Sequence, residues 1–319
     1  MIDLSSYTSV YFLGIGGIGM SGLAQYLKAE GYQVAGYDRT PSTITALLAD
    51  QDIQISFDDH VEVLTSDYLN PATTLVVYTP AIPQNSVLLG YFAAQGYTLI
   101  KRAALLGAVT RPTFCYAVAG THGKTTTSSL LAAMLVEAQS PFTAFLGGVA
   151  NQFQSNYINH GNQVSLVEAD EFDRSFLQLK PQYAVFTSTD ADHLDIYGKQ
   201  EELEKSYQDF SSLVSDKNNV FVAYGSKHLI TGVTYSASNT NADYYAMIKS
   251  RSGKGTHFSI RNNLGEDPIE DLYLNIPGQH NLENAIGAAL MTRQAGVPLE
   301  SIIAGLVNFK GIKRRFEYI

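Results

Sequence analysis

Short apolar runs alternate with longer segments of mixed polarity along the first third of the chain. Residues 9–13 (SVYFL) and 32–38 (YQVAGYD) combine β-branched and aromatic side chains, which is typical of buried parallel strands. Between them, residues 18–31 have helical spacing and end at Gly31. Residues 74–83 (TLVVYTPAIP) form a further predicted strand that leaves through prolines. Strands that alternate with helices indicate βαβ units and a mostly parallel sheet.

The same pattern begins again near residue 110, where an apolar run enters a glycine turn and a helical segment follows at 124–138. Residues 163–171 (QVSLVEADE) and 183–193 (YAVFTSTDADH) are predicted strands that end in acids. From 242 to 276 polar and apolar residues alternate, which predicts antiparallel hairpins, and residues 278–296 form a helix that ends at a glycine. The sequence therefore predicts an α/β protein with two domains.

We place these domains at residues 1–108 and 109–319, since the segment around 106–112 separates two complete strand–turn–helix starts. The first domain is predicted to be a Rossmann-like parallel-sheet domain. The second is predicted to be a P-loop ATPase-like α/β domain to which an antiparallel hairpin region is added.

Composition and charge narrow the classes of partner. The formal net charge of -9 argues against nucleic acid and membrane surfaces, because both require a basic face. A small anionic ligand stays possible, since backbone amides bind phosphate locally. The single cysteine, Cys115, excludes an intrachain disulfide, and no basic segment precedes the first apolar run. These features predict a cytoplasmic protein without a signal peptide or membrane span, and they leave the oligomeric state open.

The first glycine-rich turn, FLGIGGIGMSG, follows a predicted strand and begins a helix. Its glycines match G-x-G-x-x-G, the fingerprint of a turn that holds a diphosphate at a helix N-terminus. Asp38, at the end of the next strand, either accepts a hydrogen bond from a ribose hydroxyl or only caps a turn. The residues predicted to bind the diphosphate ligand are Gly14, Gly16, Gly17, Ile18, Gly19, Ser21 and Asp38.

The second glycine turn, AGTHGKTTT, is a shortened relative of the Walker A loop, with two residues between its glycines instead of four. Lys124 is the candidate for the β- and γ-phosphates of a nucleotide, and the Thr125 hydroxyl is the candidate for Mg²⁺. A lysine at a helix start is otherwise unfavourable to the helix dipole, which favours the phosphate-binding interpretation. The nucleotide-binding residues predicted here are Gly120, Thr121, His122, Gly123, Lys124, Thr125 and Thr126.

Two groups of acids follow the strands that come after this turn. The carboxyl ends of parallel strands meet at one sheet edge, so these side chains are expected near the glycine turn, where a hard cation needs oxygen ligands. For any single acid, a helix-capping role is the simpler interpretation. The two groups are Glu168, Asp170, Glu171 and Asp173, and then Asp190, Asp192, His193 and Asp195.

Together these motifs resemble the bacterial Mur ligases. GIGGIGMSG, AGTHGKTTT, VEADEFDRSF, DADHLDIYG, GQHNLENA and KRRFE occur in the order and approximate spacing of that family. The resemblance implies an ATP-dependent amide-bond ligase of peptidoglycan synthesis with Mg²⁺ as cofactor. It also implies that the first glycine turn binds a UDP-sugar in place of NAD, and that both substrates meet in a shared cleft. The forms GTHGKTTT and DADHLD favour the members that add L-alanine to UDP-N-acetylmuramate.

The same resemblance assigns roles to individual positions. Lys124 corresponds to the phosphate-binding lysine, and Thr125 and Glu168 correspond to ligands of the Mg²⁺ ion beside the γ-phosphate. His193 corresponds to a histidine at a second metal, so the catalytic assignments are Lys124, Glu168 and His193. Asn284 corresponds to a contact of the adenine amino group, with His280 one helical turn earlier. Arg315 corresponds to a nucleotide-contacting arginine.

Two features depart from the family pattern. Tyr207 stands where several sister ligases carry a carbamoylated lysine, and the alanine-adding members also lack that lysine. The chain stops at KRRFEYI, where the third, amino-acid-binding domain of the family would begin. We therefore expect a two-domain fragment that binds nucleotides and has little ligase activity.

Three alternatives remain at this stage. One is a sister ligase that attaches a recycled tripeptide to the same sugar, because such ligases share GTHGKTTT. Another is an NAD-dependent oxidoreductase, which the first glycine turn alone would allow. The third is a non-catalytic nucleotide-binding module.

Overall fold

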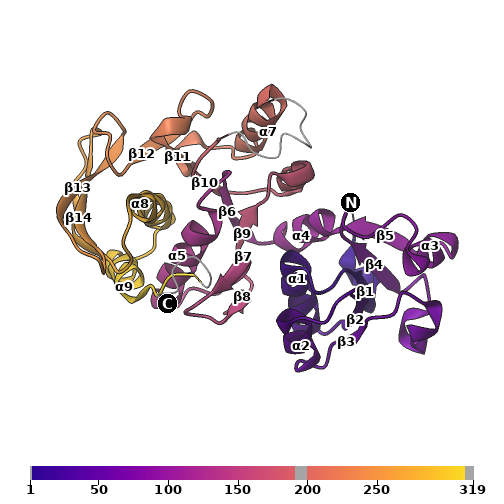
Figure 1. Ribbon diagram of the computed structural model, residues 1–319. Coiled ribbons are helices and arrows are strands. Elements are labelled where there is room, and N and C mark those ends of the chain that lie inside the picture. The colour runs from indigo at the N-terminus through magenta and orange to yellow at the C-terminus, as the bar shows by residue number, and fades with distance from the viewer. Residues whose placement is uncertain (1, 191–199, 313–319) are drawn as a thin grey trace. The chain divides into compact units, whose positions relative to one another are not determined.

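The computed structural model describes residues 2–190 and 200–312. The chain divides into two compact units, Met1–Pro112 and Thr113–Ile319 (Figure 1). Helix α4 (Arg102–Thr110) runs across the predicted boundary between residues 108 and 109, so the division lies just after this helix. Among the described residues, no helix combines the length and apolar character needed to cross a bilayer.

The first unit is built on a five-stranded sheet with strand order β3-β2-β1-β4-β5, in which every neighbouring pair is parallel. Its strands are β1 (Ser9–Leu13), β2 (Gln33–Tyr37), β3 (Gln54–Ser56), β4 (Thr74–Tyr78) and β5 (Thr98–Lys101). The other helices are α1 (Ile18–Ala29), α2 (Thr43–Ala49) and α3 (Val87–Ala94), with short 3-10 turns at Leu4–Ser6, Val61–Val63 and Ser66–Tyr68. The chain order reverses between β1 and β4, which is where open α/β sheets bind their ligands.

Helix α1 packs against both α2 and α4, whereas α3 lies against the turn at Val61–Val63. An aromatic cluster fills the core on the α3 side, with Phe92 5.3 Å from Tyr11 and 4.8 Å from Tyr97 between ring centroids. The predicted strand at 74–83 is shorter in the structure and ends at Tyr78. Pro80 and Pro83 lack the N–H group that a sheet ladder requires, which accounts for the difference.

The second unit contains a ten-stranded sheet with strand order β15-β14-β13-β12-β11-β10-β6-β9-β7-β8. The strands from β13 through β7 in this order are parallel, and antiparallel pairs extend the sheet at both ends. The strands are β6 (Phe114–Ala119), β7 (Phe142–Ala150), β8 (Ser155–Asn159), β9 (Val164–Ala169), β10 (Tyr183–Phe186), β11 (Val220–Ala223), β12 (Val233–Ser236), β13 (Tyr244–Arg251), β14 (Thr256–Asn262) and β15 (Ile269–Leu274). The hairpins predicted between 242 and 276 are confirmed, and the β7–β8 hairpin is an addition that the pattern did not indicate.

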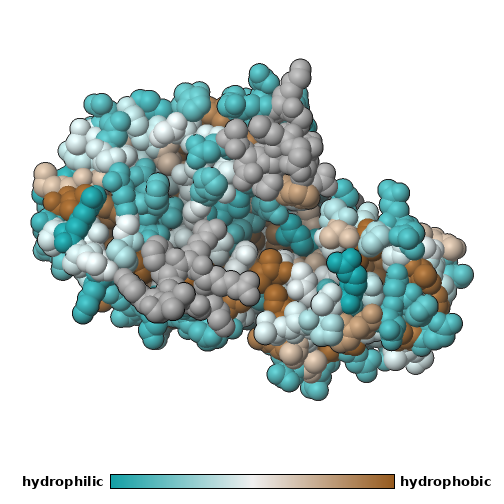
Figure 2. Space-filling view, in the orientation of Figure 1, coloured by the Kyte–Doolittle hydropathy of each residue, from teal (hydrophilic) through white to brown (hydrophobic). Residues whose placement is uncertain are grey.

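Helices α5 (Lys124–Glu137), α8 (Gln279–Gln294) and α9 (Leu299–Asn308) pack together on one face of this sheet, which curves around α8 (Figure 1). Helix α7 (Gln200–Ser212) contacts the 3-10 segment η4 (Phe172–Gln178), and shorter 3-10 turns lie at Lys217–Asn219 and Tyr224–Ser226. Helix α5 is buried on nearly all sides, as expected for a helix inside the core. Hydrophilic residues cover most of the face of this unit that Figure 2 shows.

Candidate functional site

The second glycine turn joins the carboxyl end of β6 to the first residue of α5. Gly120 and Gly123 have φ angles of +130° and +85°, a region that side-chain-bearing residues rarely adopt. A Cβ on Gly120 would lie 2.8 Å from the backbone nitrogen and oxygen of Ser188. Both glycines are therefore required by conformation, and Gly120 also by the close approach of a neighbouring chain segment.

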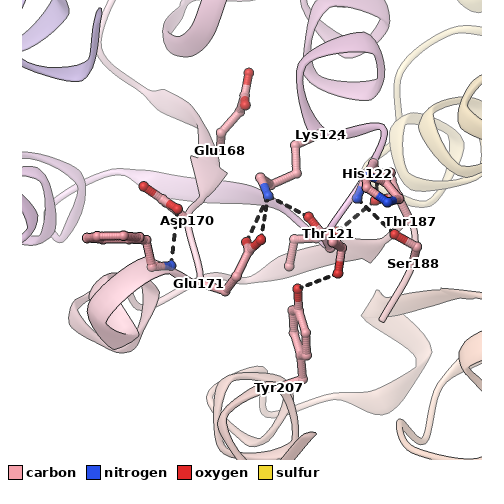
Figure 3. Close-up of polar contacts among 12 residues, drawn as sticks. Thr121, His122, Lys124, Glu168, Asp170, Glu171, Thr187, Ser188 and Tyr207 are labelled. Carbon is pink, nitrogen blue, oxygen red and sulfur yellow. Dashed lines mark hydrogen bonds and ion pairs between the residues drawn. The ribbon is translucent and has the colours of Figure 1, made fainter. Parts of the chain in front are cut away.

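The segment that follows β10 holds this turn in place. The Thr187 hydroxyl bonds the carbonyl oxygens of Ala119 (3.1 Å) and His122, and the His122 N–H donates to Ser188 Oγ at 2.9 Å (Figure 3). Thr121 Oγ1 donates to the carbonyl oxygen of Asp190 at 2.7 Å. The turn is thus fixed by backbone and hydroxyl groups of the segment after β10, whose sequence TSTD gave only a weak signal of this role.

Tyr207 reaches the same turn from α7. Its side chain is fully buried, and its hydroxyl lies 3.4 Å from Thr121 Oγ1 (Figure 3). The ring packs edge-on against Phe176 and Phe186, with centroid distances of 5.7 and 6.3 Å. Tyr207, the residue that departs from the sister-ligase pattern, therefore lies beside the second glycine turn.

Lys124 is the first residue of α5, and its ammonium group folds back over the turn. Nζ donates to the carbonyl oxygen of Gly120 at 2.6 Å and to both carboxylate oxygens of Glu171 at 2.9 and 2.8 Å (Figure 3). The Lys124 side chain is 17% exposed and that of Glu171 is 1% exposed. Glu171 was one of four acids in its group, and the structure singles it out as the partner of this lysine.

Glu168, near the end of β9, accepts hydrogen bonds from the opposite side of the helix start. Its Oε2 accepts from Thr125 Oγ1 at 3.1 Å, and its Oε1 accepts from Ser128 Oγ at 3.0 Å and from the N–H of Gly147 at 2.6 Å. Burial raises the pKa of the Glu168 carboxyl, and these three hydrogen bonds partly oppose the rise. Sequence reasoning missed Ser128 and Gly147, although Ser128 lies one helical turn after Lys124.

The oxygen donors of Thr125 and Glu168 suit a hard divalent cation such as Mg²⁺. Within residues 2–190 and 200–312, no group of three His, Cys, Asp or Glu side chains is arranged to hold a metal ion.

Helix α8 contributes one predicted nucleotide contact to the turn. A Cβ on Gly123 would lie 2.5 Å from Asn284 Oδ1, so this buried asparagine lies directly against the turn. His280 lies one helical turn earlier and is exposed. Between them, the partly buried Glu283 accepts a hydrogen bond from the N–H of Ala237 at 2.7 Å, and burial raises its pKa. Thr126 is buried in the first turn of α5.

His193 and Arg315 lie outside the described residues, as do Asp192 and Asp195. Their predicted roles stay predictions.

The first glycine turn lies at the carboxyl end of β1, where Gly14 has a φ of +87° and Gly17 precedes α1. The N–H of Gly16 donates to Asp38 Oδ2 at 2.7 Å. Of the two interpretations of Asp38, this contact is the one expected of a residue that caps the turn. The contact also stabilises the turn in the shape that brings the Gly16 backbone close to the end of β2.

Two further residues, Ser21 in α1 and Arg102 in α4, lie near this turn. Ser21 is fully buried and donates its hydroxyl to the carbonyl oxygen of Ile18 at 3.0 Å, and its predicted role at the diphosphate stays a prediction. Arg102, which sequence reasoning missed, lies against the start of α1. A Cβ on Gly19 would be 2.9 Å from its Nη1 atom. A cation is therefore present where the diphosphate was predicted.

Comparison with known proteins identifies the family of this chain. A sequence profile of the Mur ligase family catalytic domain matches residues 9–113, and one of the Mur ligase middle domain matches residues 118–292. The chain belongs to the Mur ligase family.

Among curated Mur ligases, the UDP-N-acetylmuramate–L-alanine ligase of Flavobacterium psychrophilum is 45% identical over 99% of this chain and 69% of its own length. The enzyme of that name from Porphyromonas gingivalis is 42% identical over 97% of this chain and 69% of its own length.

Among solved structures, the UDP-N-acetylmuramate–alanine ligase of Thermotoga maritima matches with a TM-score of 0.84 and 26% identity, over 97% of this chain and 70% of that one. A UDP-N-acetylmuramate:L-alanyl-γ-D-glutamyl-meso-diaminopimelate ligase from Neisseria meningitides matches with a TM-score of 0.82 at 20% identity, covering 97% of this chain and all of that one, which shows a shared fold. The predicted α/β fold class and the Mur ligase resemblance are confirmed.

Proposed function

We propose that this chain supplies the UDP-sugar-binding and ATP-binding domains of a ligase that joins L-alanine to UDP-N-acetylmuramate, with ATP converted to ADP and phosphate. Relatives with this name, at 42–45% identity over nearly the whole chain, support the choice of reaction. The observation that carries the proposal is the glycine turn at the start of α5. Lys124 bonds back to the Gly120 carbonyl oxygen of this turn, and the Thr125 hydroxyl bonds the Glu168 carboxylate.

Each of the two glycine turns binds a different substrate. The turn formed by Gly14, Gly16 and Gly19 presents the N-terminus of α1 to the diphosphate of the UDP-sugar. The turn from Gly120 to Gly123 presents the N-terminus of α5 to the phosphates of ATP. The predicted domains 1–108 and 109–319 correspond to the compact units Met1–Pro112 and Thr113–Ile319, and the family resemblance implies a third domain that binds the amino acid.

The reaction follows from the charge on the substrates. The muramoyl carboxylate attacks the γ-phosphorus of ATP, ADP leaves, and an acyl phosphate forms. The amine of L-alanine then attacks the acyl carbon, phosphate leaves, and the amide remains after the nitrogen loses a proton. Lys124 is suited to the first step, because it brings a positive charge to the place where two anions must approach each other.

The oxygen ligands for Mg²⁺ would be the Thr125 hydroxyl and the Glu168 carboxylate. The ion supplies neutralisation of phosphate charge when it is bound. Asn284 and His280 would face the adenine end of the nucleotide, and His193 and Arg315 keep the roles that the family resemblance implies.

Calorimetric titration with ATP tests the nucleotide site. Lys124→Ala is expected to weaken ATP binding by about 10- to 150-fold, because a hydrogen bond to a charged group contributes about 1.5–3 kcal/mol. Lys249→Ala is the matched control, since Lys249 is an exposed lysine that pairs with Asp271 on the β13–β15 hairpins at 2.5 Å. Equal ATP affinity in the parent chain and in Lys124→Ala would remove Lys124 from the site.

Titration with UDP-N-acetylmuramate and with NAD tests the first turn. We expect binding of the UDP-sugar, and binding of NAD alone would contradict the ligase proposal.

The acceptor amine is tested by phosphate release in a version extended through the predicted C-terminal domain. Turnover with L-alanine supports the proposal, whereas turnover only with the tripeptide would favour the sister reaction.

A further inference from the structure

The ammonium group of Lys124 has three N–H donors, and three oxygen atoms of the chain accept from it. One acceptor is the carbonyl oxygen of Gly120 at 2.6 Å, and the other two are Oε1 and Oε2 of Glu171 at 2.9 and 2.8 Å. A phosphate oxygen can therefore bind this ammonium group only if one of the three contacts is given up.

The three contacts differ in how easily each can be released. The bond to Gly120 keeps the lysine side chain folded over the turn, so its loss would swing the ammonium group away from the site. The two bonds to Glu171 end on the same carboxylate, so the loss of one leaves the ion pair intact. The Glu171 side chain is only 1% exposed, so its complete separation from the Lys124 ammonium group would remove a favourable contact from a buried charge. The contact that can be released is therefore one of the two to Glu171.

The local backbone explains why Glu171 and not a neighbouring acid makes this pair. Strand β9 ends at Ala169, and Glu171 has φ of -70° and ψ of -21°, so the chain has already turned from the strand into η4. Asp170 lies between them and accepts a hydrogen bond from the N–H of Phe172 at 3.2 Å. Glu168, still within the strand, is held by Thr125, Ser128 and Gly147.

The acids of the segment EADE therefore act at different places around the start of α5. Glu168 accepts a hydrogen bond from the Thr125 hydroxyl. Glu171 accepts from Lys124, as Figure 3 shows. The Glu171 carboxylate also offsets the unfavourable position of a cation at a helix N-terminus.

We propose that Glu171 holds two of the three N–H donors of Lys124 and yields one of them to the triphosphate. This inference rests on the proposed ATP-binding function. It means that Glu171 and the β- or γ-phosphate compete for one N–H of the same lysine.

The test is ATP affinity in Glu171→Gln, measured by calorimetry. Glutamine keeps the size of the side chain and removes its charge, so Lys124 becomes more available to phosphate. We expect ATP and inorganic tripolyphosphate to bind about 3- to 10-fold more tightly, both with and without Mg²⁺, because a competing negative charge is gone. AMP, which lacks the β- and γ-phosphates, should bind as it does to the parent chain. If Glu171 had a purely structural role, Glu171→Gln would weaken the binding of ATP, tripolyphosphate and AMP to a similar extent.

One variant serves as the control. Glu202→Gln removes an ion-paired glutamate in α7, 2.7 Å from Arg174, and should leave ATP affinity unchanged. Unchanged or weaker ATP binding in Glu171→Gln would overturn the inference, and weakening confined to Mg²⁺-ATP would identify Glu171 as a metal ligand instead.

A structure of the parent chain with a non-hydrolysable ATP analogue gives a test that does not depend on a variant. One Lys124–Glu171 contact should remain and the other should be replaced by a phosphate oxygen. Retention of both contacts, or loss of both, would contradict the inference. Failure of the parent chain to bind ATP would instead reject the proposed function, so the two failures are distinguishable.

Discussion

The effect on stability of the contact between the second glycine turn and α8 can be measured with one matched pair of glycine substitutions. Gly123 and Gly265 have nearly equal φ angles, +85° and +81°. A Cβ on Gly123 would lie 2.5 Å from Asn284 Oδ1, whereas a Cβ on Gly265 would meet nothing within 4 Å. Gly123→Ala and Gly265→Ala therefore share the backbone strain and differ in the contact with Asn284.

The size of the effect follows from terms that cancel and one term that does not. A left-handed φ costs a residue with a side chain about 1–2 kcal/mol, and the loss of freedom in the unfolded chain returns about 0.4–1 kcal/mol. Both terms apply to both variants. Displacing a buried neighbour costs about 1–3 kcal/mol and applies to Gly123→Ala alone. For a unit that spans residues 113–319, each kcal/mol lowers Tm by about 2–4 °C, so the variants should differ by roughly 2–12 °C.

The assay is thermal unfolding of both variants, repeated in an Asn284→Ala background. Removing the Asn284 side chain leaves room for the new methyl group, so the difference between the two glycine variants should fall to within about 0.5 kcal/mol. Equal destabilisation by Gly123→Ala and Gly265→Ala in the parent background would refute the predicted contact. A difference that persists in the Asn284→Ala background would assign the strain to another part of the turn.

Two further predictions concern Glu168 and the first glycine turn. Because burial raises the pKa of Glu168 above its ordinary value of 4.5, the native state binds more protons than the unfolded state between 4.5 and the raised pKa, and stability falls as pH rises through that window. Glu168→Gln should therefore gain stability over the parent most at neutral pH and least below pH 4.5 in denaturant titrations, while it weakens Mg²⁺-ATP binding; a stability gap independent of pH would contradict this. In Gly16→Val, a Cβ would lie 2.8 Å from Asp38 Oδ2 and 2.9 Å from Thr45 Cγ2. This variant should lose UDP-N-acetylmuramate binding and keep ATP binding, and an unchanged UDP-sugar affinity would count against the first turn as the binding site.

Local signals in the sequence were sufficient for the elements that frame both turns. The apolar run at 9–13 is the strand β1, and the helix predicted at Lys124 begins there. These features depend on neighbouring residues alone: a buried strand needs a short apolar run, and a turn with positive φ favours glycine. The prolines at 80 and 83 were visible in the same segment, and they explain why β4 ends before the predicted boundary.

The sequence by itself determined the α/β class, the two glycine turns and the residue types able to bind phosphate and Mg²⁺. Only the tertiary structure decided which of those residues meet. The strand order places β6 between β9 and β10, so Glu168, Glu171 and Thr187 reach one turn from both sides. Asn284 reaches Gly123, and Arg102 reaches Gly19, from helices far along the chain. Such contacts depend on strand order and on how helices pack, and nothing in the neighbouring sequence encodes them, because each joins segments that are brought together only when the sheet and its helices have formed.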